Sequence, residues 1–180
     1  MHDNTVIPGS NARWFSLARV GLFLVLALLI PSIGLPQPIT GSLVNALLLL
    51  AVETSGLGTA LVVGMITPMV ALLHGVLPLP LLVMIPFIAV GNATLASVHY
   101  ALRPRGRWLA LAAAAATKFM VLFAAVTWLV ARPLNLMIGG SAQLVALPTP
   151  FGQMMSWPQL GTALSGGLIA FGVLWLAERK

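Results

Sequence analysis

The stretch WLALAAAAATKFMVLFAAVTWLVA, residues 108 to 131, is apolar along nearly its whole length and interrupted chiefly by Thr117, Lys118 and Thr127. An apolar run of about 20 residues is long enough to cross a bilayer as a helix. Peptide groups find no water in lipid, so a crossing segment must be a helix or part of a closed barrel. Because the run is continuous and does not alternate, it favours a membrane-spanning helix.

Similar apolar runs recur along the chain, in which 59% of the 180 residues are hydrophobic and only 7% are charged. A soluble domain of this size leaves too much of its surface in water to hide so many apolar side chains. Divided at Pro, Gly and charged residues, the sequence predicts spans at residues 14–33, 42–52, 57–75, 79–102, 108–131 and 159–176. We therefore expect an all-α integral membrane protein with a single domain, residues 1–180. It comprises a tail at 1–13 and a six-helix bundle at 14–178.

The second span is short and ends at the polar sequence ETSG, residues 53–56. An alternative is that the second and third spans form a single broken span, which would give five spans in total. The basic residues favour six spans, because loops on the cytoplasmic side of a membrane are enriched in Lys and Arg. With six spans, seven of the nine basic residues share one side: Arg13, Arg19, Arg103, Arg105, Arg107, Arg179 and Lys180. We therefore expect both termini to be cytoplasmic.

Three connections then lie outside, at residues 34–41, 76–78 and 132–158. The first belongs to GLPQPITGSLVNALLLL, residues 34–50, in which Pro36 and Pro38 restrict the backbone. Restricted loops lose less entropy when they close over a ligand. The third connection is long, and long loops in compact domains are often lids or binding loops. We expect these loops to cover a cavity that opens outward, although prolines are also ordinary residues of a rigid turn.

Lys118 lies close to the middle of its span. A cation there costs about 2.5–3.5 kcal/mol on insertion scales and normally faces a cavity or a partner. The chain has only three acidic residues, Asp3, Glu53 and Glu178, and all are expected near the cytoplasmic side or the chain ends. The hypothesis is that Lys118 binds an anionic group of a solute. The alternatives are a lysine that snorkels to the interface and one that hydrogen-bonds backbone carbonyls.

Other polar side chains fall at membrane depth or near the outer surface, where an amide or hydroxyl must find partners. Helix–helix hydrogen bonds would satisfy that need without any ligand. The sequence also allows these residues to surround one pocket with Lys118. The candidate substrate-binding residues are therefore Lys118, Asn92, Asn45, Gln37, Thr40, Thr127, Trp128, Gln159 and Thr162.

Several function classes are disfavoured. There is no cysteine, which excludes disulfides, thiolate metal sites and iron–sulfur clusters. His74 and His99 lie on different predicted helices without ligand spacing, so we expect neither a metal site nor a cofactor. The chain has no P-loop, no HExxH and no GxSxG arrangement. We therefore do not expect an enzyme, and any uphill transport would draw its energy from a partner.

Two stretches resemble the substrate-binding subunits, or S components, of energy-coupling-factor transporters. They are the proline-rich LPQPITGSLVNALLLL and the following GLGTALVVGMITPMVALLHGVLPLPLLVMIPFIAVGNA. The similarity covers most of residues 14–178 and is strongest over 35–92. The resemblance implies a six-helix bundle in a cell (inner) membrane that captures a micronutrient from outside. It also implies docking onto a membrane coupling subunit driven by two ATPase subunits.

The expected function is therefore a binding subunit for a small anionic or zwitterionic solute, with no nucleic-acid partner. One alternative is a facilitator or channel that works without partners, and another is a small membrane assembly factor. A small membrane enzyme is a further class, which no catalytic cluster supports. The identity of the solute is open at this point.

Overall fold

The computed structural model describes residues 10–132, 134–138, 140–145 and 149–179. Residues 1–9 of the predicted tail lie outside the described residues. The α-helices are α1 (Ser10–Ser32), α2 (Gln37–Ser55), α3 (Leu57–Leu73), α4 (Ile85–Leu102), α5 (Arg107–Ala131), α6 (Thr149–Met154) and α7 (Trp157–Glu178). Two 3₁₀ turns, η1 (Leu79–Met84) and η2 (Arg103–Arg105), flank α4, and the strands are β1 (Leu134–Ile138) and β2 (Ser141–Val145).

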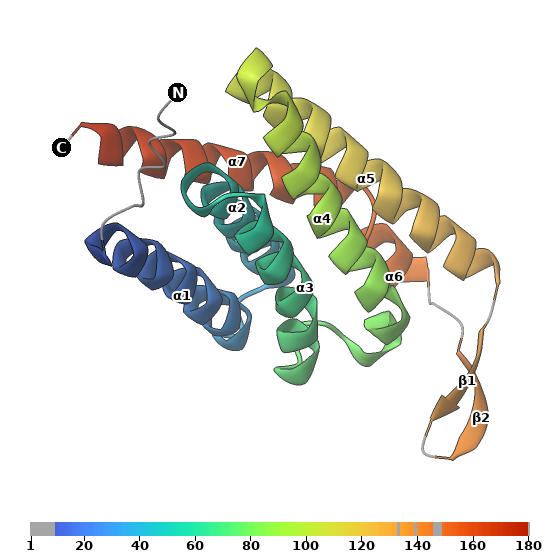
Figure 1. Cartoon of the computed structure of the whole chain (residues 1–180). Helices are drawn as coiled ribbons and strands as arrows, with labels where there is room; N and C mark the ends of the chain where they lie inside the picture. The colour runs from blue at the N-terminus through green and yellow to red at the C-terminus, as the bar shows by residue number, and fades with distance from the viewer. Residues whose placement is uncertain (1–9, 133, 139, 146–148, 180) are drawn as a thin grey trace, which may run out of the picture.

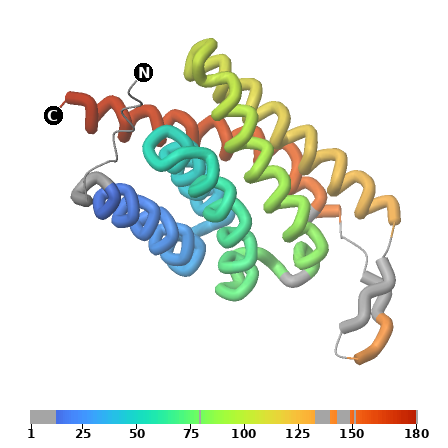
Figure 2. Tube along the Cα trace, viewed as in Figure 1, coloured from blue at the N-terminus to red at the C-terminus, as the bar shows by residue number. Residues whose placement is uncertain are grey.

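Six of these helices form an all-α membrane bundle, as the sequence predicts. In the described part of the chain, five are long and apolar enough to cross a membrane, and α3 is a shorter apolar helix of 17 residues. At 1.5 Å per residue α3 is about 25 Å long, close to the thickness of the hydrocarbon core. Helices α4 and α5 run side by side along their length (Figure 2). The chain is therefore a multi-pass membrane protein.

The prediction of a short second helix is wrong. Helix α2 has 19 residues and begins at Gln37, so most of the predicted loop at 34–41 is its first turn. Pro38 lies in that first turn, where proline is favourable because its missing N–H would have no helical partner. At the other end Gly56 has φ +87° and reverses the chain, so α2 and α3 are two packed helices and not one broken span. The proline-rich segment is therefore a rigid turn into a helix.

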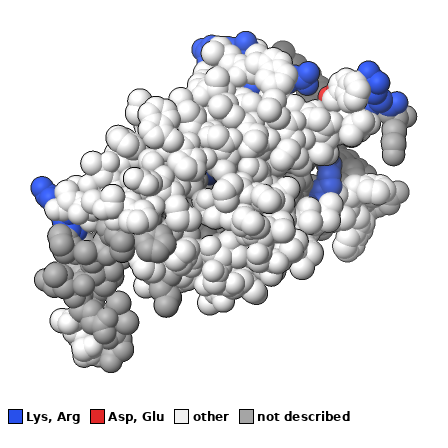
Figure 3. Space-filling view, turned by 180° about the vertical axis from the view of Figure 1, so that it is seen from behind, with Lys and Arg blue, Asp and Glu red and all other residues white. Residues whose placement is uncertain are grey.

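The basic side chains gather at one end of the bundle (Figure 3). The Arg19 guanidinium donates to the Thr54 carbonyl at 3.1 Å, and the Arg103 guanidinium donates to the Val52 carbonyl at 3.2 Å. These bonds bring the beginning of α1, the end of α2 and the end of α4 together. We call this the basic end; its described Arg residues are Arg13, Arg19, Arg103, Arg105, Arg107 and Arg179. Arg132, after α5, lies at the opposite end.

The long connection at 132–158 is not the irregular loop that the sequence predicts. Strands β1 and β2 form an antiparallel hairpin in which Leu134 pairs with Val145. Gly140 has φ +84° in the turn between them, a conformation that glycine adopts without strain. The hairpin projects away from the helices (Figure 1), so it does not cover the bundle. Of this connection, residues 133, 139 and 146–148 lie outside the described residues.

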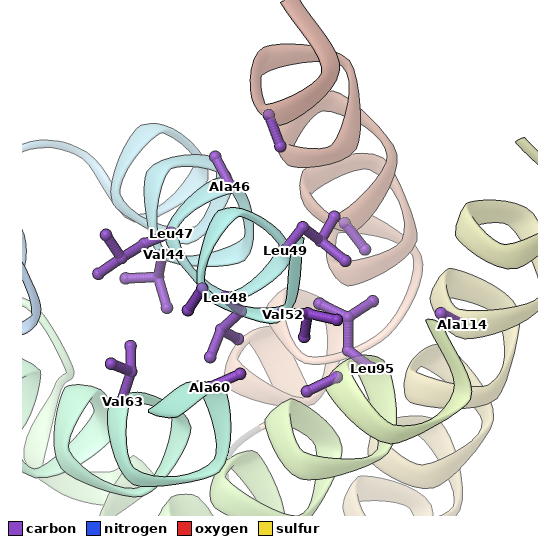
Figure 4. Close-up of a cluster of buried hydrophobic side chains, with 14 of the residues drawn as sticks. Val44, Ala46, Leu47, Leu48, Leu49, Val52, Ala60, Val63, Leu95 and Ala114 are labelled. Carbon is purple, nitrogen blue, oxygen red and sulfur yellow. The ribbon is translucent and has the colours of Figure 1, made fainter. Parts of the chain in front are cut away.

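Aliphatic side chains fill the half of the bundle nearer the basic end. Figure 4 shows part of this cluster, to which Leu48, Leu49 and Val52 of α2 and Leu95 of α4 belong. Helix α7 approaches α2 closely at Gly166, where an added Cβ would lie 2.6 Å from the Ser42 carbonyl oxygen. Small residues permit such close backbone contact in membranes. This contact fixes α2, and with it Asn45, against α7.

Candidate functional site

The buried Lys118 of α5 is the centre of the candidate site. Its side chain is 3% exposed, so it does not snorkel to the interface. Its Nζ donates to Asn45 Oδ1 of α2 at 2.6 Å and to Asn92 Oδ1 of α4 at 2.7 Å. Its described acceptors are thus side-chain amides, and not the backbone carbonyls of the alternative interpretation. One ammonium group joins three helices.

The two amides are held with their oxygens toward Lys118 by partners on further helices. Asn92 Nδ2 donates to the Gly64 carbonyl of α3 at 3.0 Å, with Thr67 Oγ1 at 3.5 Å. Asn45 Nδ2 lies 3.3 Å from Thr162 Oγ1 of α7. Each amide therefore donates on one side and accepts on the other. The network joins α2, α3, α4, α5 and α7.

A proline explains why the Gly64 carbonyl is free to accept. In a helix this oxygen normally accepts from the N–H four residues later, and that residue is Pro68, which has no N–H. A freed carbonyl in a membrane helix must find another partner. The Asn92 amide supplies it, so the position of Pro68 in the sequence determines where Asn92 docks.

When it is protonated, the Lys118 amine has no counter-ion among the described residues. Glu53 contacts His99 and Arg103 at the basic end, and Glu178 ends α7 at the same end. Asp3 lies outside the described residues. An ammonium has three N–H donors, and the two asparagines accept from two of them. The site therefore combines a buried positive charge with a donor that a ligand can use.

A cavity of about 70 Å³ lies beside Lys118 in the half of the bundle away from the basic end. One water needs only about 10–15 Å³, so the space is sufficient for a small organic group. The lining comes from α1 through α5, from the turn before η1, from the segment that precedes α7 and from the first turn of α7. The lining residues are Pro31, Gln37, Thr40, Gly41, Val44, Asn45, Thr67, Pro68, Ala71, Val76, Leu77, Ile88, Asn92, Lys118, Met155 and Gln159.

The structure brings most of the sequence-predicted residues to this cavity. The six that line it are Lys118, Asn92, Asn45, Gln37, Thr40 and Gln159. Thr162 joins the cluster through its contact with Asn45 and donates its own hydroxyl to the Gln159 carbonyl at 3.1 Å. The sequence analysis placed Gln37 and Thr40 in a loop that covers the cavity. In the structure they reach the cavity from the first turn of α2.

Thr127 and Trp128 lie outside the cavity. Thr127 is nine residues after Lys118, which turns it by about 180° around the helix axis. Its exposed hydroxyl donates back to the Phe123 carbonyl at 2.7 Å, and it lines a separate surface hollow near α6. Trp128 is 46% exposed. Both residues lie on α5, as Lys118 does, but they are not on the face of that helix that lines the cavity.

Sequence reasoning missed Thr67, Pro68 and Met155, all of which line the cavity. Pro68 carried a usable signal, because a proline within a span marks a free carbonyl four residues earlier. Thr67 lies beside it, one turn after Gly64. Met155 precedes α7 in a segment whose fold the sequence did not reveal. Its side chain is 2% exposed and packs against Leu77 and Leu129.

A second polar cluster lies at the basic end. His99 Nε2 is 2.7 Å from Glu53 Oε1, and Arg103 Nη1 is 3.6 Å from Glu53 Oε2. His74 lies at the opposite end, with its Nδ1 3.0 Å from the Val70 carbonyl oxygen. Within the described ranges, no three His, Cys, Asp or Glu side chains are grouped as metal ligands would be.

In comparisons with protein-family models, with curated proteins and with solved structures, this chain has no match.

Proposed function

We propose that the chain is the substrate-binding subunit of an ATP-driven micronutrient importer and that it captures a small anionic or zwitterionic solute from outside the cell. The observation that carries this proposal is Lys118, which lies 3% exposed beside a cavity with only neutral amides as described partners. Burying a charge without a counter-ion is costly in lipid. An anionic ligand in the cavity offsets that cost.

The direction of capture follows from the distribution of charge. The basic end is the cytoplasmic end if the chain obeys the positive-inside tendency. Helix α1 begins and α7 ends at the basic end, which puts the described parts of both termini on the cytoplasmic side. The cavity lies in the other half of the bundle and faces outward. In a bacterial cell this corresponds to the cell (inner) membrane.

Packing below the cavity supports binding rather than free passage. The aliphatic cluster drawn in Figure 4 lies between the Lys118 network and the basic end. Its members include Leu48, Leu95 and Ala114, which are fully buried. Solute held at Lys118 therefore needs a conformational change to continue inward. We infer that a coupling subunit and two ATPase subunits supply the energy, as the resemblance to S components implies.

The first experiment tests for a bound solute. The full chain is purified in mild detergent, and the small molecules that it retains are released and identified by mass spectrometry. We expect one solute with an anionic group in the wild type and in the Thr117→Ala control, because Thr117 is exposed and adjacent to Lys118. We expect its loss in Lys118→Met. Equal retention by folded Lys118→Met would overturn the proposal.

A second experiment separates a binding subunit from a facilitator. The chain is reconstituted alone into liposomes with the identified solute outside. A binding subunit gives at most one bound molecule per chain and no sustained uptake. Uptake that continues beyond this stoichiometry without ATPase subunits would favour a facilitator. An assembly factor would retain no solute but would co-purify with a client complex.

A further inference from the structure

The cavity has few polar atoms that a ligand can use, because most are already engaged. The Thr40 hydroxyl donates to the Leu35 carbonyl at 3.0 Å, and Gln159 Nε2 donates to the Met154 carbonyl at 3.1 Å. The Asn45 and Asn92 amide nitrogens point to Thr162 and Gly64. The strongest donor left for a ligand is the third N–H of the Lys118 ammonium.

A cationic group on the ligand would find no oppositely charged partner among the described lining residues, which offer it only neutral amides and hydroxyls. None of the described lining residues is acidic, and none is aromatic, so neither an ion pair nor a cation–π contact is available. The oxygens of Asn45 and Asn92 already accept from Lys118. A ligand ammonium would instead meet the like charge of Lys118 in a poorly hydrated space. The site therefore disfavours zwitterions as well as cations.

The rest of the lining is aliphatic. Val44, Ile88 and Met155 come from three different segments, and Ala71 and Leu77 complete much of the wall. Such a surface fits a short hydrocarbon body by excluding water. The volume of about 70 Å³ limits that body to a few carbon atoms. The chemistry of the cavity is thus one cationic group, a few neutral polar side chains and a largely apolar wall.

We propose that the ligand is a small monoanion without a cationic group, in the form of one carboxylate on a short aliphatic chain. This inference rests on the proposed function and narrows it, because an amino-acid-like zwitterion is excluded. The carboxylate accepts from Lys118 Nζ, and the aliphatic chain extends along Val44 and Ile88. The two asparagines act as positioning residues that hold the ammonium in place.

The test uses four probes with the same carbon skeleton. They are pentanoate, 2-aminopentanoate, pentanamide and pentylamine, each titrated into the purified full chain by calorimetry. We expect pentanoate to bind at least about a hundredfold more tightly than 2-aminopentanoate, since the added ammonium is buried without a counter-charge and close to the Lys118 ammonium. Pentanamide lacks the charge and pentylamine carries the wrong one, so both should bind more weakly than pentanoate.

Variants of Lys118 test whether this residue causes the preference for pentanoate over the other probes. Lys118→Met should abolish the preference for pentanoate over pentanamide, whereas Thr117→Ala should keep it. Lys118→Arg retains the charge and should retain the order of the four probes if it folds. If Lys118→Met fails to fold, the probe series on the wild type decides by itself.

The outcomes separate the two proposals. If 2-aminopentanoate binds as tightly as pentanoate and both need Lys118, the monoanion inference falls while the proposed function stands. If no probe binds but a solute is retained from the cells, the charge of that solute decides: a monoanion supports the inference and a zwitterion overturns it. If nothing binds and nothing is retained, both proposals fall.

Discussion

The bundle holds two clusters of polar side chains, one around the buried His99 and one around the buried Lys118, whose charges are balanced differently. At the basic end, the Glu53 carboxylate lies between His99 and Arg103, so opposite charges are available within the protein. In the middle of α5, the Lys118 ammonium has only the neutral amides of Asn45 and Asn92 as its described partners. A cluster that contains its own counter-charge is complete in charge without a ligand, although the buried His99 Nδ1 has no hydrogen-bond partner among the described residues. The Lys118 cluster is complete only when something else brings the negative charge.

The first way to break this comparison disturbs the Lys118 cluster through packing alone. In Gly166→Ala, the new Cβ would lie 2.6 Å from the Ser42 carbonyl oxygen and from Asn45 Cβ, so α7 and α2 must separate. We expect the free energy of unfolding to fall by about 3 kcal/mol. Thermal unfolding in detergent measures the change, and calorimetry measures the accompanying loss of pentanoate binding.

Gly161→Ala is the matched control on the same helix. A Cβ there meets nothing within 4 Å, and alanine favours a helix over glycine. We expect this variant to be neutral or more stable by up to about 1 kcal/mol. If both alanine variants behaved alike, the close contact between α2 and α7 would be refuted.

The next prediction concerns the cluster of Glu53, His99 and Arg103 at the basic end. Glu53→Leu removes the acceptor of His99 Nε2, and His99 is fully buried. Leaving a buried donor unpaired should lower the free energy of unfolding by about 1–3 kcal/mol. Binding of pentanoate should not change, since the aliphatic cluster separates Glu53 from the cavity. Thermal unfolding and calorimetry on the same preparation check both parts.

A more conservative variant also tests whether the two clusters are independent. Glu53→Gln keeps a side-chain oxygen for His99 but loses the charge that faces Arg103. We expect a smaller loss of stability than in Glu53→Leu, because the Arg103 side chain is 34% exposed and water screens it. A change in pentanoate affinity in either variant would show that the two clusters are not independent.

Lys118→Met should change stability less than Glu53→Leu. It removes two hydrogen bonds and leaves the buried Asn45 and Asn92 oxygens without this donor, but it also removes a buried charge that lacks a counter-ion, which offsets that cost. Hydrogen bonds between membrane helices are worth only about 0.6 kcal/mol on average, so we expect a net change of no more than about 1 kcal/mol. Thermal unfolding without ligand is the measurement. A loss larger than that of Glu53→Leu would mean that Lys118 serves mainly to hold the helices together.

The sequence was sufficient for the class of fold and for the burial of Lys118 within its helix. Long apolar runs determine helices in lipid, and Lys118 stood out because a cation at that depth is costly. The partners were not predictable, since Asn45 lies 73 residues from Lys118 in the chain and their contact depends on how α2 and α5 pack. The orientation of α5 in the bundle also had to be known before Thr127 could be excluded from the lining of the cavity.

The predicted length of the second helix was wrong for a different reason. Pro36 and Pro38 suit a loop and the start of a helix equally well, so their presence did not decide between them. The structure has Pro36 just before α2 and Pro38 in its first turn. Conversely, Pro68 carried information that the sequence analysis did not use, because it frees the Gly64 carbonyl to which Asn92 binds.

The smallest expected change in stability comes from giving the Lys118 cluster its own counter-charge. In Asn45→Asp, one carboxylate oxygen can still accept from Lys118 Nζ. The other faces the Thr162 hydroxyl, which can rotate to donate to it and leave the Gln159 carbonyl. The fold should therefore be preserved, while the carboxylate of Asp replaces the one that a ligand would bring. We expect pentanoate affinity to fall by about a hundredfold with essentially unchanged thermal unfolding.

Asn92→Asp is the informative contrast, although it introduces the same charge beside the same lysine. Its second oxygen would face the Gly64 carbonyl, which cannot donate, so this variant should lose both stability and binding. Tight pentanoate binding in folded Asn45→Asp would contradict the comparison from which these predictions start. It would mean that an internal carboxylate does not compete with the ligand and that the charge of Lys118 does not select what the cavity holds.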